Sequence, residues 1–340
     1  MSTNVISQDE IAGLRWLAQE AGISDFLFGH VLSSVRLCKS LYTVISIPKN
    51  NGGFRNLNVP DLYLMKVQRA INKNVLCEFP VYEAAFGFSG GNIVDAINPH
   101  LRSKVLLSFD IVKAFEKVSL EDVMACLLEN REEDYWEGIQ EFGKLSWYAA
   151  RAISQISTIK NTGRWYDTCL PQGAPTSPRL FDLAFKSTDY ALSFLVRKYG
   201  GIYTRYADNI FISLVDKTYL APKIERAIFR TLANKWRWWR PQFLWHKRSV
   251  RRLDRGAAVR MLGLNIIDGK ITVPRDYKRN LRLAIHHVRY LLAHNLPHEE
   301  AWLRLNGQMA HAFRGFLPNR LVINYEDLRE EVEYLQSLDS

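Results

Sequence analysis

Two aspartates lie at the ends of segments whose residue patterns are typical of β-strands. Asp110 is at the carboxyl end of the apolar run KVLLSFDIV (104–112), and Asp208 is at the tight turn of GIYTRYADNIFISLVD (201–216). In isolation, an aspartate in such a place is usually a turn former or a helix cap. Two carboxylates at one edge of a sheet can instead hold Mg²⁺, which leaves coordination positions for substrate phosphates. The pair therefore predicts phosphoryl transfer at two metal ions.

The apolar patterns place the rest of the chain in strands and helices. Residues 42–48 (YTVISIP) and 54–60 (FRNLNVP) flank the turn-forming KNNGG, which predicts a β-hairpin. A second hairpin is expected in RMLGLNII and DGKITVP. Apolar residues at three- and four-residue spacing predict helices over 9–37, 61–78, 119–130, 142–158, the segment after LPQGAPTSP (170–178), 221–237, and from Tyr277 to the C-terminus. This mixture of strands and helices predicts an α+β fold.

The composition is that of a folded globular protein with a positive net charge. Of 340 residues, 47% are hydrophobic, and 45 basic against 35 acidic side chains give a net charge of +10. A positive balance favours nucleic-acid partners through counterion release, although an ordinary basic protein shares it. No apolar run approaches the ~20 residues of a membrane span, and no signal peptide is expected in MSTNVISQDE. Four scattered cysteines argue against a zinc site or a disulfide framework and fit a reducing cytoplasm.

Several short motifs occur in an order that resembles the reverse transcriptase family. FDIVKAF (109–115), LPQGAPTSP (170–178) and YADN (206–209) are similar to its A, B and C motifs. The fingers motifs resemble IPKNNGGFR (47–55) and VQRAI (67–71), and the D motif and primer-grip hairpin resemble FLWHKRS (243–249) and RMLGLNI (260–266). The resemblance covers about residues 40–320, and LPQGAPTSP is its most specific element.

The resemblance implies a right-hand polymerase fold with fingers, a palm built on an antiparallel sheet, and a helical thumb. The expected division is an N-terminal helical extension (1–40), fingers with part of the palm (41–103), palm (104–266) with a fingers insertion at about 119–160, and thumb (267–340). Asp110 and Asp208 would bind Mg²⁺, with Mn²⁺ as an alternative ion.

Nucleotide-binding roles follow from the same resemblance. Lys49 and Arg55 would lie over the incoming triphosphate, whose oxygens suit point charges and bidentate donors. Gln172 and Gly173 would line the nucleotide pocket, where glycine permits close backbone approach. Phe115 matches the steric gate that excludes a ribose 2′-hydroxyl, and core packing is the alternative interpretation. Lys247 is the candidate general acid for the leaving pyrophosphate, and a solvated basic residue is the alternative.

One catalytic position departs from the family pattern. The turn usually reads YADD, whereas this chain has Asn209 in place of the second aspartate. Asparagine keeps a carbonyl oxygen but carries no charge, which weakens the attraction for Mg²⁺. The resemblance implies that the second aspartate is the less direct ligand, so we expect activity to survive with a lower rate or a changed metal preference. An inactive polymerase is the alternative.

Two basic stretches are candidates for contact with nucleic acid. KWRWWRPQFLWHKRSVRRLDR (235–255) interleaves tryptophans with Arg237, Arg240, Arg248, Arg251 and Arg252. Arginines can neutralise phosphates while exposed indoles stack on bases, although the tryptophans also suit a core and the arginines a solvated face. PRDYKRNLRLAIHHVRY (274–290), with Lys278 and Arg279, resembles the start of a thumb that grips a duplex through its backbone.

The chain resembles the compact enzymes of bacterial retrons and of related defence-associated systems. GFSGGNIVDAINPH (87–100) resembles the retron segment between fingers and palm, but Ala96-Ile97 stands where retrons have Asn-Ala before the residue matching His100. Met261-Leu262-Gly263 likewise replaces Val-Thr-Gly. Both departures favour a neighbouring defence-associated group.

The expected function is an RNA-directed DNA polymerase of a retron or antiphage defence system, copying a cognate noncoding RNA in the cytoplasm. Expected partners are the RNA template, the DNA product and deoxynucleoside triphosphates, with an effector protein or further copies of the chain as additional partners. Two other functions stay open, a template-independent or protein-primed DNA polymerase and a catalytically weak nucleic-acid-binding scaffold. The template, primer, effector and oligomeric state are not determined by the sequence.

Overall fold

The structure of the chain is a computed structural model. It describes residues 7–37, 39–49, 52–88, 90–129, 145–160, 168–216, 218–235, 248–294, 296–309, 316–317 and 319–338. Within these residues, no helix is long and apolar enough to span a membrane.

The N-terminal region is a pair of helices, α1 (Gln8–Glu20) and α2 (Asp25–Arg36). Each begins at a serine whose hydroxyl accepts a backbone N–H three residues later, Ser7 from Glu10 and Ser24 from Leu27. Both helices pack against α6 (Trp147–Ser157), and α2 also packs against α3 (Leu62–Asn74). The helical character expected for 9–37 is therefore confirmed, with a break at residues 21–24.

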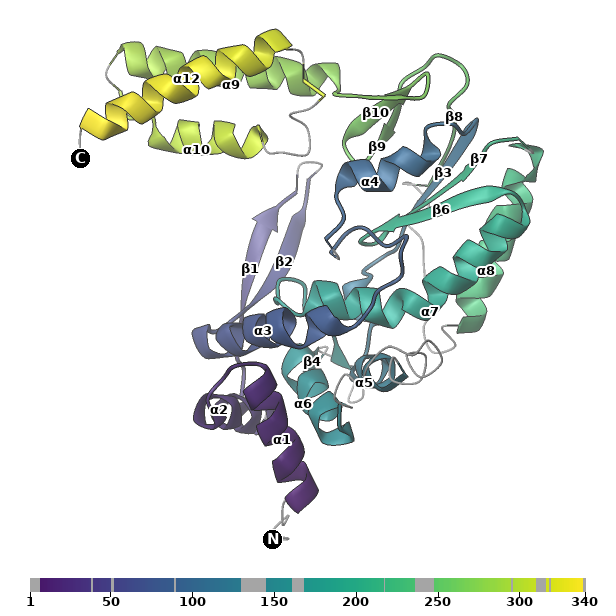
Figure 1. The fold of residues 1–340 in the computed structure, drawn as a ribbon, viewed down its shortest axis with the longest axis vertical. Coiled ribbons are helices and arrows are strands. Elements are labelled where there is room, and N and C mark those ends of the chain that lie inside the picture. The colour runs from purple at the N-terminus through teal and green to yellow at the C-terminus, as the bar shows by residue number, and fades with distance from the viewer. Residues whose placement is uncertain are drawn as a thin grey trace.

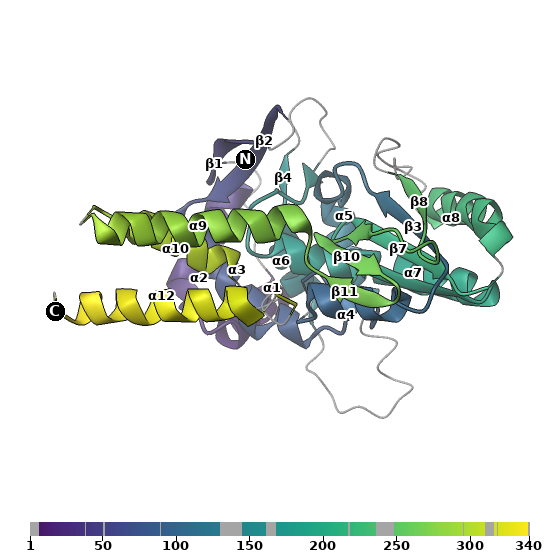
Figure 2. The same ribbon diagram turned by 90° about the horizontal axis from the view of Figure 1, so that it is seen from above.

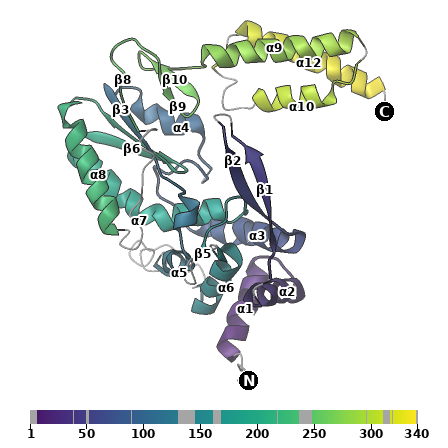
Figure 3. The ribbon, with the colours of Figure 1, turned by 180° about the vertical axis from the view of Figure 1, so that it is seen from behind.

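A two-stranded hairpin precedes α3 in the chain, and its strands are β1 (Tyr42–Pro48) and β2 (Phe54–Pro60) (Figure 1). The strands pair antiparallel from Tyr42 with Pro60 to Pro48 with Phe54. Gly52 and Gly53 both have positive φ in the connecting turn, where glycine carries no steric penalty. Most side chains of β1 are exposed. Figure 3 shows the hairpin standing between the N-terminal and C-terminal helices.

The central sheet has four antiparallel strands in the order β6-β7-β3-β8. They are β6 (Gly201–Tyr206), β7 (Asn209–Leu214), β3 (Val105–Asp110) and β8 (Ser249–Arg252). Alternation along β3 sends Leu107 and Phe109 into a core formed with the helices α5 (Leu120–Glu129), α7 (Ser177–Lys198) and α8 (Ala221–Lys235). Leu106, Ser108 and Asp110 therefore belong to the opposite face.

A second core joins that opposite face to the C-terminal region. Leu106 and Phe211 pack with residues of a small sheet, β9 (Val259–Met261), β10 (Leu264–Ile267) and β11 (Lys270–Thr272). The same core continues into three helices, α9 (Arg275–Ala293), α10 (Glu299–Gln308) and α12 (Asn319–Leu338). Figure 2 shows α9 and α12 side by side, extending away from the central sheet.

Short elements complete the connections. They are α4 (Ile93–Ile97), β4 (Ile159–Lys160), β5 (Thr168–Cys169), and the 3₁₀ turns η1 (Leu76–Glu78), η2 (Asn98–His100), η3 (Phe115–Lys117) and η5 (Thr218–Leu220). The α+β class predicted from the sequence is confirmed, as are both predicted hairpins. Strand β8 was not expected, because its sequence SVRR reads as part of a basic stretch and only its pairing with β3 makes it a strand.

Candidate active site

The central sheet brings Asp110 and Asp208 to one edge. Asp110 ends β3 and lies opposite Asn209, the first residue of β7. The backbone N–H of Ile111 donates to the carbonyl of Asp208 at 3.0 Å, so the strand end and the hairpin turn are held together. Asp110 is only 8% exposed. The prediction that the two aspartates meet at the same sheet edge is thus confirmed as a matter of strand pairing.

The turn that carries Asp208 is a tight two-residue connection between β6 and β7. Tyr206 pairs with Asn209, and Ala207 adopts a positive φ of 54°. A positive φ at the first central residue is a feature of the turns that suit the twist of antiparallel hairpins, and it is unusual for alanine. The side-chain amide of Asn209 donates to Asp208 Oδ1 at 3.1 Å. Asn209 therefore contacts the aspartate next to it instead of adding a third carboxylate.

The donor set at this edge fits a hard divalent cation. Asp110 and Asp208 supply carboxylate oxygens, and the described residues contain no group of three or more His, Cys, Asp or Glu side chains placed to hold a metal ion. Mg²⁺ commonly uses one or two carboxylates and completes its shell with water and substrate phosphates. The residues present therefore fit Mg²⁺ better than Zn²⁺, which prefers histidine and cysteine ligands.

A buried ionic network lies beneath the turn, and its residues were not among the predicted site residues. Arg205 of β6 donates to Asp189 from Nε and Nη2, both at 2.8 Å, and from Nη1 to Asp182 at 2.7 Å. The side chains of all three residues are fully buried. Tyr203 donates its hydroxyl to Asp189 Oδ1 at 2.5 Å. Asp182 and Asp189 lie on the buried face of α7, at helical positions where apolar residues are usual.

The network perturbs the ionisation of its members. Burial raises the pKa of the Asp189 carboxyl, although the adjacent Arg205 guanidinium opposes that rise. Burial alone would lower the pKa of Arg205, but the carboxylates of Asp189 and Asp182 raise it beyond its ordinary value. Arg205 is therefore a permanent buried cation that needs its two acidic partners.

The loop that contains Gln172 and Gly173 is fixed to the hairpin. The backbone N–H of Asn58, on β2, donates to the carbonyl of Gln172 at 2.7 Å. Gly173 has a φ of 117°, and a Cβ added there would lie 3.0 Å from the Asn58 carbonyl oxygen. Glycine is thus required at 173 both by its conformation and by the close approach of β2. The contact links the predicted nucleotide-pocket loop to the strand that carries Arg55.

Phe115 lies in the 3₁₀ turn η3, and its ring is half-buried. Its ring centroid is 5.2 Å from that of Phe181 and 6.1 Å from that of Phe88. The side chain therefore does pack against the core. This packing is compatible with a steric gate, because a gate must be held rigidly, and the gate stays a prediction.

Lys49 and Arg55 lie on the exposed hairpin and make no salt bridge within the described parts of the chain. The backbone N–H of Lys49 donates to Gly53 at 3.0 Å and closes the turn. Their predicted role over a triphosphate stays a prediction.

The basic residues predicted to contact nucleic acid fall into different surroundings. Arg248 forms an ion pair with Glu225 of α8, and Arg252 pairs with Asp254 at 2.6 Å. Arg251 is exposed on β8, Lys278 is half-buried and Arg279 is exposed on α9. Lys247, Arg237 and Arg240 lie outside the described residues, as do the neighbouring tryptophans.

His100 is fully buried at the end of η2 and joins it to two strands. Its ring nitrogens lie 2.6 Å from Ser213 Oγ on β7 and 2.7 Å from Thr204 Oγ1 on β6. Burial lowers the pKa of His100 to about 3, so the ring is neutral near pH 7. The residue thus stabilises the sheet behind the turn, away from the two aspartates.

Comparison with known proteins gives this arrangement a family. Residues 47–266 match the family described as "Reverse transcriptase (RNA-dependent DNA polymerase)". The chain belongs to the reverse transcriptase family. The matched segment runs from β1 to β10 and includes both aspartates. Family membership also confirms the right-hand polymerase fold expected from the motifs.

Retron reverse transcriptases are among the similar proteins. The Retron Mx162 reverse transcriptase of Myxococcus xanthus is 31% identical over 260 residues, covering 72% of this chain and 52% of that protein. The Retron Mx65 reverse transcriptase of the same organism is 29% identical over 252 residues, covering 72% and 55% respectively. The chain thus spans about half the length of these two curated relatives. A telomerase from Candida tropicalis, solved with a TWJ fragment of telomeric RNA, is 14% identical with a TM-score of 0.47, covering 88% of this chain and 55% of that one.

Proposed function

We propose that this reverse transcriptase family member is an RNA-directed DNA polymerase that extends a DNA strand on an RNA template. The observation that carries the proposal is the pairing of β3 with β7, which puts Asp110 beside the Asp208 turn within the family's matched region. Asp110 and Asp208 would hold Mg²⁺. Bound there, Mg²⁺ would activate the attacking 3′-hydroxyl and stabilise the leaving pyrophosphate.

Other residues would bind and select the nucleotide. Lys49 and Arg55 on the hairpin would contact the triphosphate, and the loop with Gln172 and Gly173 would form a wall of the pocket. The hydrogen bond from Asn58 to Gln172 supports this assignment, because it joins the hairpin to the loop. Phe115 would exclude the ribose 2′-hydroxyl. Lys247 would protonate the leaving group.

The proposed subdomains follow the predicted boundaries. Residues 1–40 form the N-terminal extension, 41–103 the fingers with part of the palm, 104–266 the palm, and 267–340 the thumb. The small sheet β9–β11 would then lie at the junction of palm and thumb. The expected partners are an RNA template, a DNA product and deoxynucleoside triphosphates, and the template would be a cognate noncoding RNA of a retron or defence system.

The test is primer extension by the purified protein on a defined RNA template with Mg²⁺ and labelled deoxynucleotides. The same assay is run with the Asp110→Asn protein and with RNA that co-purifies from cells. DNA complementary to the template, absent with the variant, is the expected result. Homopolymeric or repetitive DNA would support a template-independent polymerase instead. Tight RNA binding without nucleotide incorporation, in Mg²⁺ and in Mn²⁺, would support the alternative function of a catalytically weak nucleic-acid-binding scaffold, in which Asn209 replaces a catalytic aspartate.

A further inference from the structure

Arg205 is connected to the turn that carries Asp208 as well as to its acidic partners. Besides donating to Asp182, Nη1 donates to the backbone carbonyl of Ala207 at 2.9 Å. Ala207 is the first residue of the two-residue turn, directly before Asp208. The orientation that the two carboxylates impose on the guanidinium is therefore transmitted to the backbone of the turn.

Aromatic rings restrict the guanidinium further. Its central carbon lies 5.3 Å from the ring centroid of Phe181 and 5.0 Å from that of Phe185, both on α7. Such cation–aromatic contacts are strongest where water is excluded, as it is around this fully buried side chain. Two carboxylates and two aromatic rings thus surround the guanidinium and restrict its orientation.

A second segment holds the same turn from outside the network. Arg205 receives a backbone hydrogen bond from Phe86 at 2.9 Å and donates one to Ala84 at 2.8 Å, so residues 84–86 run alongside β6. A Cβ added at Gly87 would lie 2.3 Å from the backbone nitrogen of Ala207. The turn thus contacts the guanidinium through the Ala207 carbonyl and lies against Gly87 at the Ala207 nitrogen.

Fold stability alone does not account for this arrangement. A buried ion pair is frequently no more stabilising than apolar residues of the same volume. An arginine that donates to two carboxylates and a turn carbonyl instead fixes geometry, because its planar donors permit few alternatives. Geometry matters at this turn, since a displacement of about 1 Å at a reacting centre can lower a rate about a hundredfold.

We propose that Arg205 is a positioning residue that holds the Ala207–Asp208 turn so that the Asp208 carboxylate meets Asp110 at the metal site. The inference rests on the proposed function of the two aspartates. Arg205 itself touches neither substrate nor metal. It acts through the Ala207 carbonyl, with Asp182, Asp189 and Gly87 fixing its own place.

The first variant is Arg205→Lys, which keeps the charge but not the planar set of donors. The matched control is His100→Asn, because His100 of η2 is also fully buried against β6 and β7 but contacts Thr204 and Ser213 instead of the turn. Turnover per active site, counted from the burst of the first nucleotide added, is measured against Mg²⁺ concentration. Thermal unfolding is recorded for both proteins, since both substitutions are expected to lower stability.

The proposal predicts different catalytic effects for the two variants. Arg205→Lys lowers turnover per active site by about tenfold or more and raises the Mg²⁺ concentration for half-maximal rate. The KM for primer–template stays unchanged. His100→Asn loses stability but keeps the wild-type turnover and Mg²⁺ dependence. A folded Arg205→Lys protein whose turnover per active site and Mg²⁺ dependence both equal those of the wild-type protein would overturn the proposal.

A second variant serves if Arg205→Lys does not fold. Gly87→Ala pushes on the same turn from the segment beside β6 and leaves the buried charges intact, so it should reproduce the fall in turnover and the higher Mg²⁺ requirement. An active Gly87→Ala protein with an unaltered Mg²⁺ dependence would then overturn the proposal.

Mn²⁺ binding separates this proposal from the proposed function. Electron paramagnetic resonance measures free Mn²⁺ in titrations of the wild-type, Arg205→Lys and Gly87→Ala proteins, with Asp208→Ala as the reference for loss of the site. Should the wild-type protein polymerise nothing, the proposed function fails. Weaker Mn²⁺ binding by the two turn variants would still support the positioning role, and unchanged binding would overturn it.

Discussion

The residue type at position 209 affects the negative charge of the proposed metal site, because asparagine is neutral and aspartate is not. Its amide donates to Asp208 Oδ1 at 3.1 Å, where an aspartate would add a second charge to the turn. We expect Asn209→Asp to lower the Mg²⁺ concentration for half-maximal primer extension several-fold, because opposite charges at short range attract strongly where water is partly excluded. Initial rates across a Mg²⁺ titration check this. An unchanged curve, with Asn209→Ala also unchanged, would show that position 209 does not influence the metal.

Phe115 is the residue proposed to select the sugar of the incoming nucleotide. We expect Phe115→Ala to raise incorporation of ribonucleotides relative to deoxynucleotides by at least about tenfold, because removing the ring opens space for a 2′-hydroxyl. Competition between matched ribo- and deoxynucleotides in primer extension measures it. Phe88→Ala is the control, since it removes the ring 6.1 Å away without removing the gate. Unaltered sugar choice in Phe115→Ala would reduce Phe115 to a packing residue.

The sequence predicts the two aspartates of the proposed metal site but not the buried residues beneath the turn. Asp110 and Asp208 were predictable because each follows a strand pattern, and pairing of those strands brings the two together. The sequence does not predict the buried network of Arg205, Asp182 and Asp189, because a charged residue in a strand or helix is ordinarily exposed. One signal was present: Asp182 and Asp189 are seven residues apart on α7, at a spacing that returns to the same helix face.

Among the elements, η2 depends on His100 for its attachment to β6 and β7. The folded ring has a pKa of about 3, against an ordinary value of 6.5 that the unfolded chain would show. Between these values the unfolded chain binds more protons, so the stability contributed by the neutral ring is complete above pH 6.5. It is lost as pH falls from 6.5 toward 3, by up to about 1.4 kcal/mol per pH unit.

Urea unfolding between pH 5 and 7 tests this dependence. The wild-type free energy of unfolding should fall as pH is lowered. The free energy of unfolding of His100→Asn should be lower at pH 7 and should change less with pH. The difference between the two proteins therefore shrinks toward acidic pH. Parallel pH profiles would mean that His100 does not account for the loss.

The elements differ in how far the sequence determines them. The hairpin β1–β2 and the turn between β6 and β7 carry their own signals, a glycine-containing turn between two strand-like segments in the first and a tight turn between two strand-like segments in the second. Strands β4, β5 and β8 carry none, because two- to four-residue strands exist only through their partners. The contact of Asn58 with the Gln172 loop joins residues 114 positions apart (172 − 58), so it too depends on tertiary structure.

At the scale of the whole molecule, the proposed active site lies where two hydrophobic cores share one sheet. Leu107 and Phe109 of β3 belong to the core with α7 and α8, and Leu106 belongs to the core shared with α9 and α12. Asp110 ends that strand. The two sides of the molecule therefore meet at the strand that carries a proposed metal ligand.

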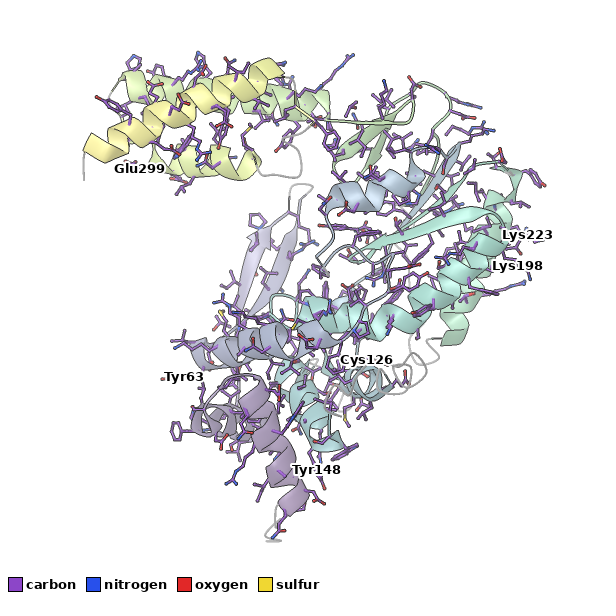
Figure 4. The ribbon with its side chains drawn as sticks, viewed as in Figure 1. Tyr63, Cys126, Tyr148, Lys198, Lys223 and Glu299 are labelled. Atoms are coloured by element: carbon purple, nitrogen blue, oxygen red, sulfur yellow. The ribbon has the colours of Figure 1, made fainter. Side chains whose placement is uncertain are left out.

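The net charge of +10 predicts salt-sensitive binding to nucleic acid, and α9 offers cations for it. We expect Lys278→Ala/Arg279→Ala to weaken binding of an RNA–DNA duplex and to reduce the slope of log affinity against log salt by about one for each phosphate that is no longer neutralised. Fluorescence anisotropy at several salt concentrations measures the slope. The charge-matched control is Lys198→Ala/Lys223→Ala, at the edge of the molecule beside α8 (Figure 4). An equal reduction of the slope in both proteins would indicate non-specific attraction.

The central claim is that Asp110 and Asp208 act as one catalytic unit. The most direct measurement is the rate of single-nucleotide addition on an RNA template by Asp110→Asn, Asp208→Asn and the double variant. If the carboxylates hold one metal site, each single variant loses about as much rate as the double, since residues that act together are strongly non-additive. The claim would be contradicted if the fold losses of rate in the two single variants multiplied to give the loss in the double variant. A single variant with the wild-type rate would also contradict it.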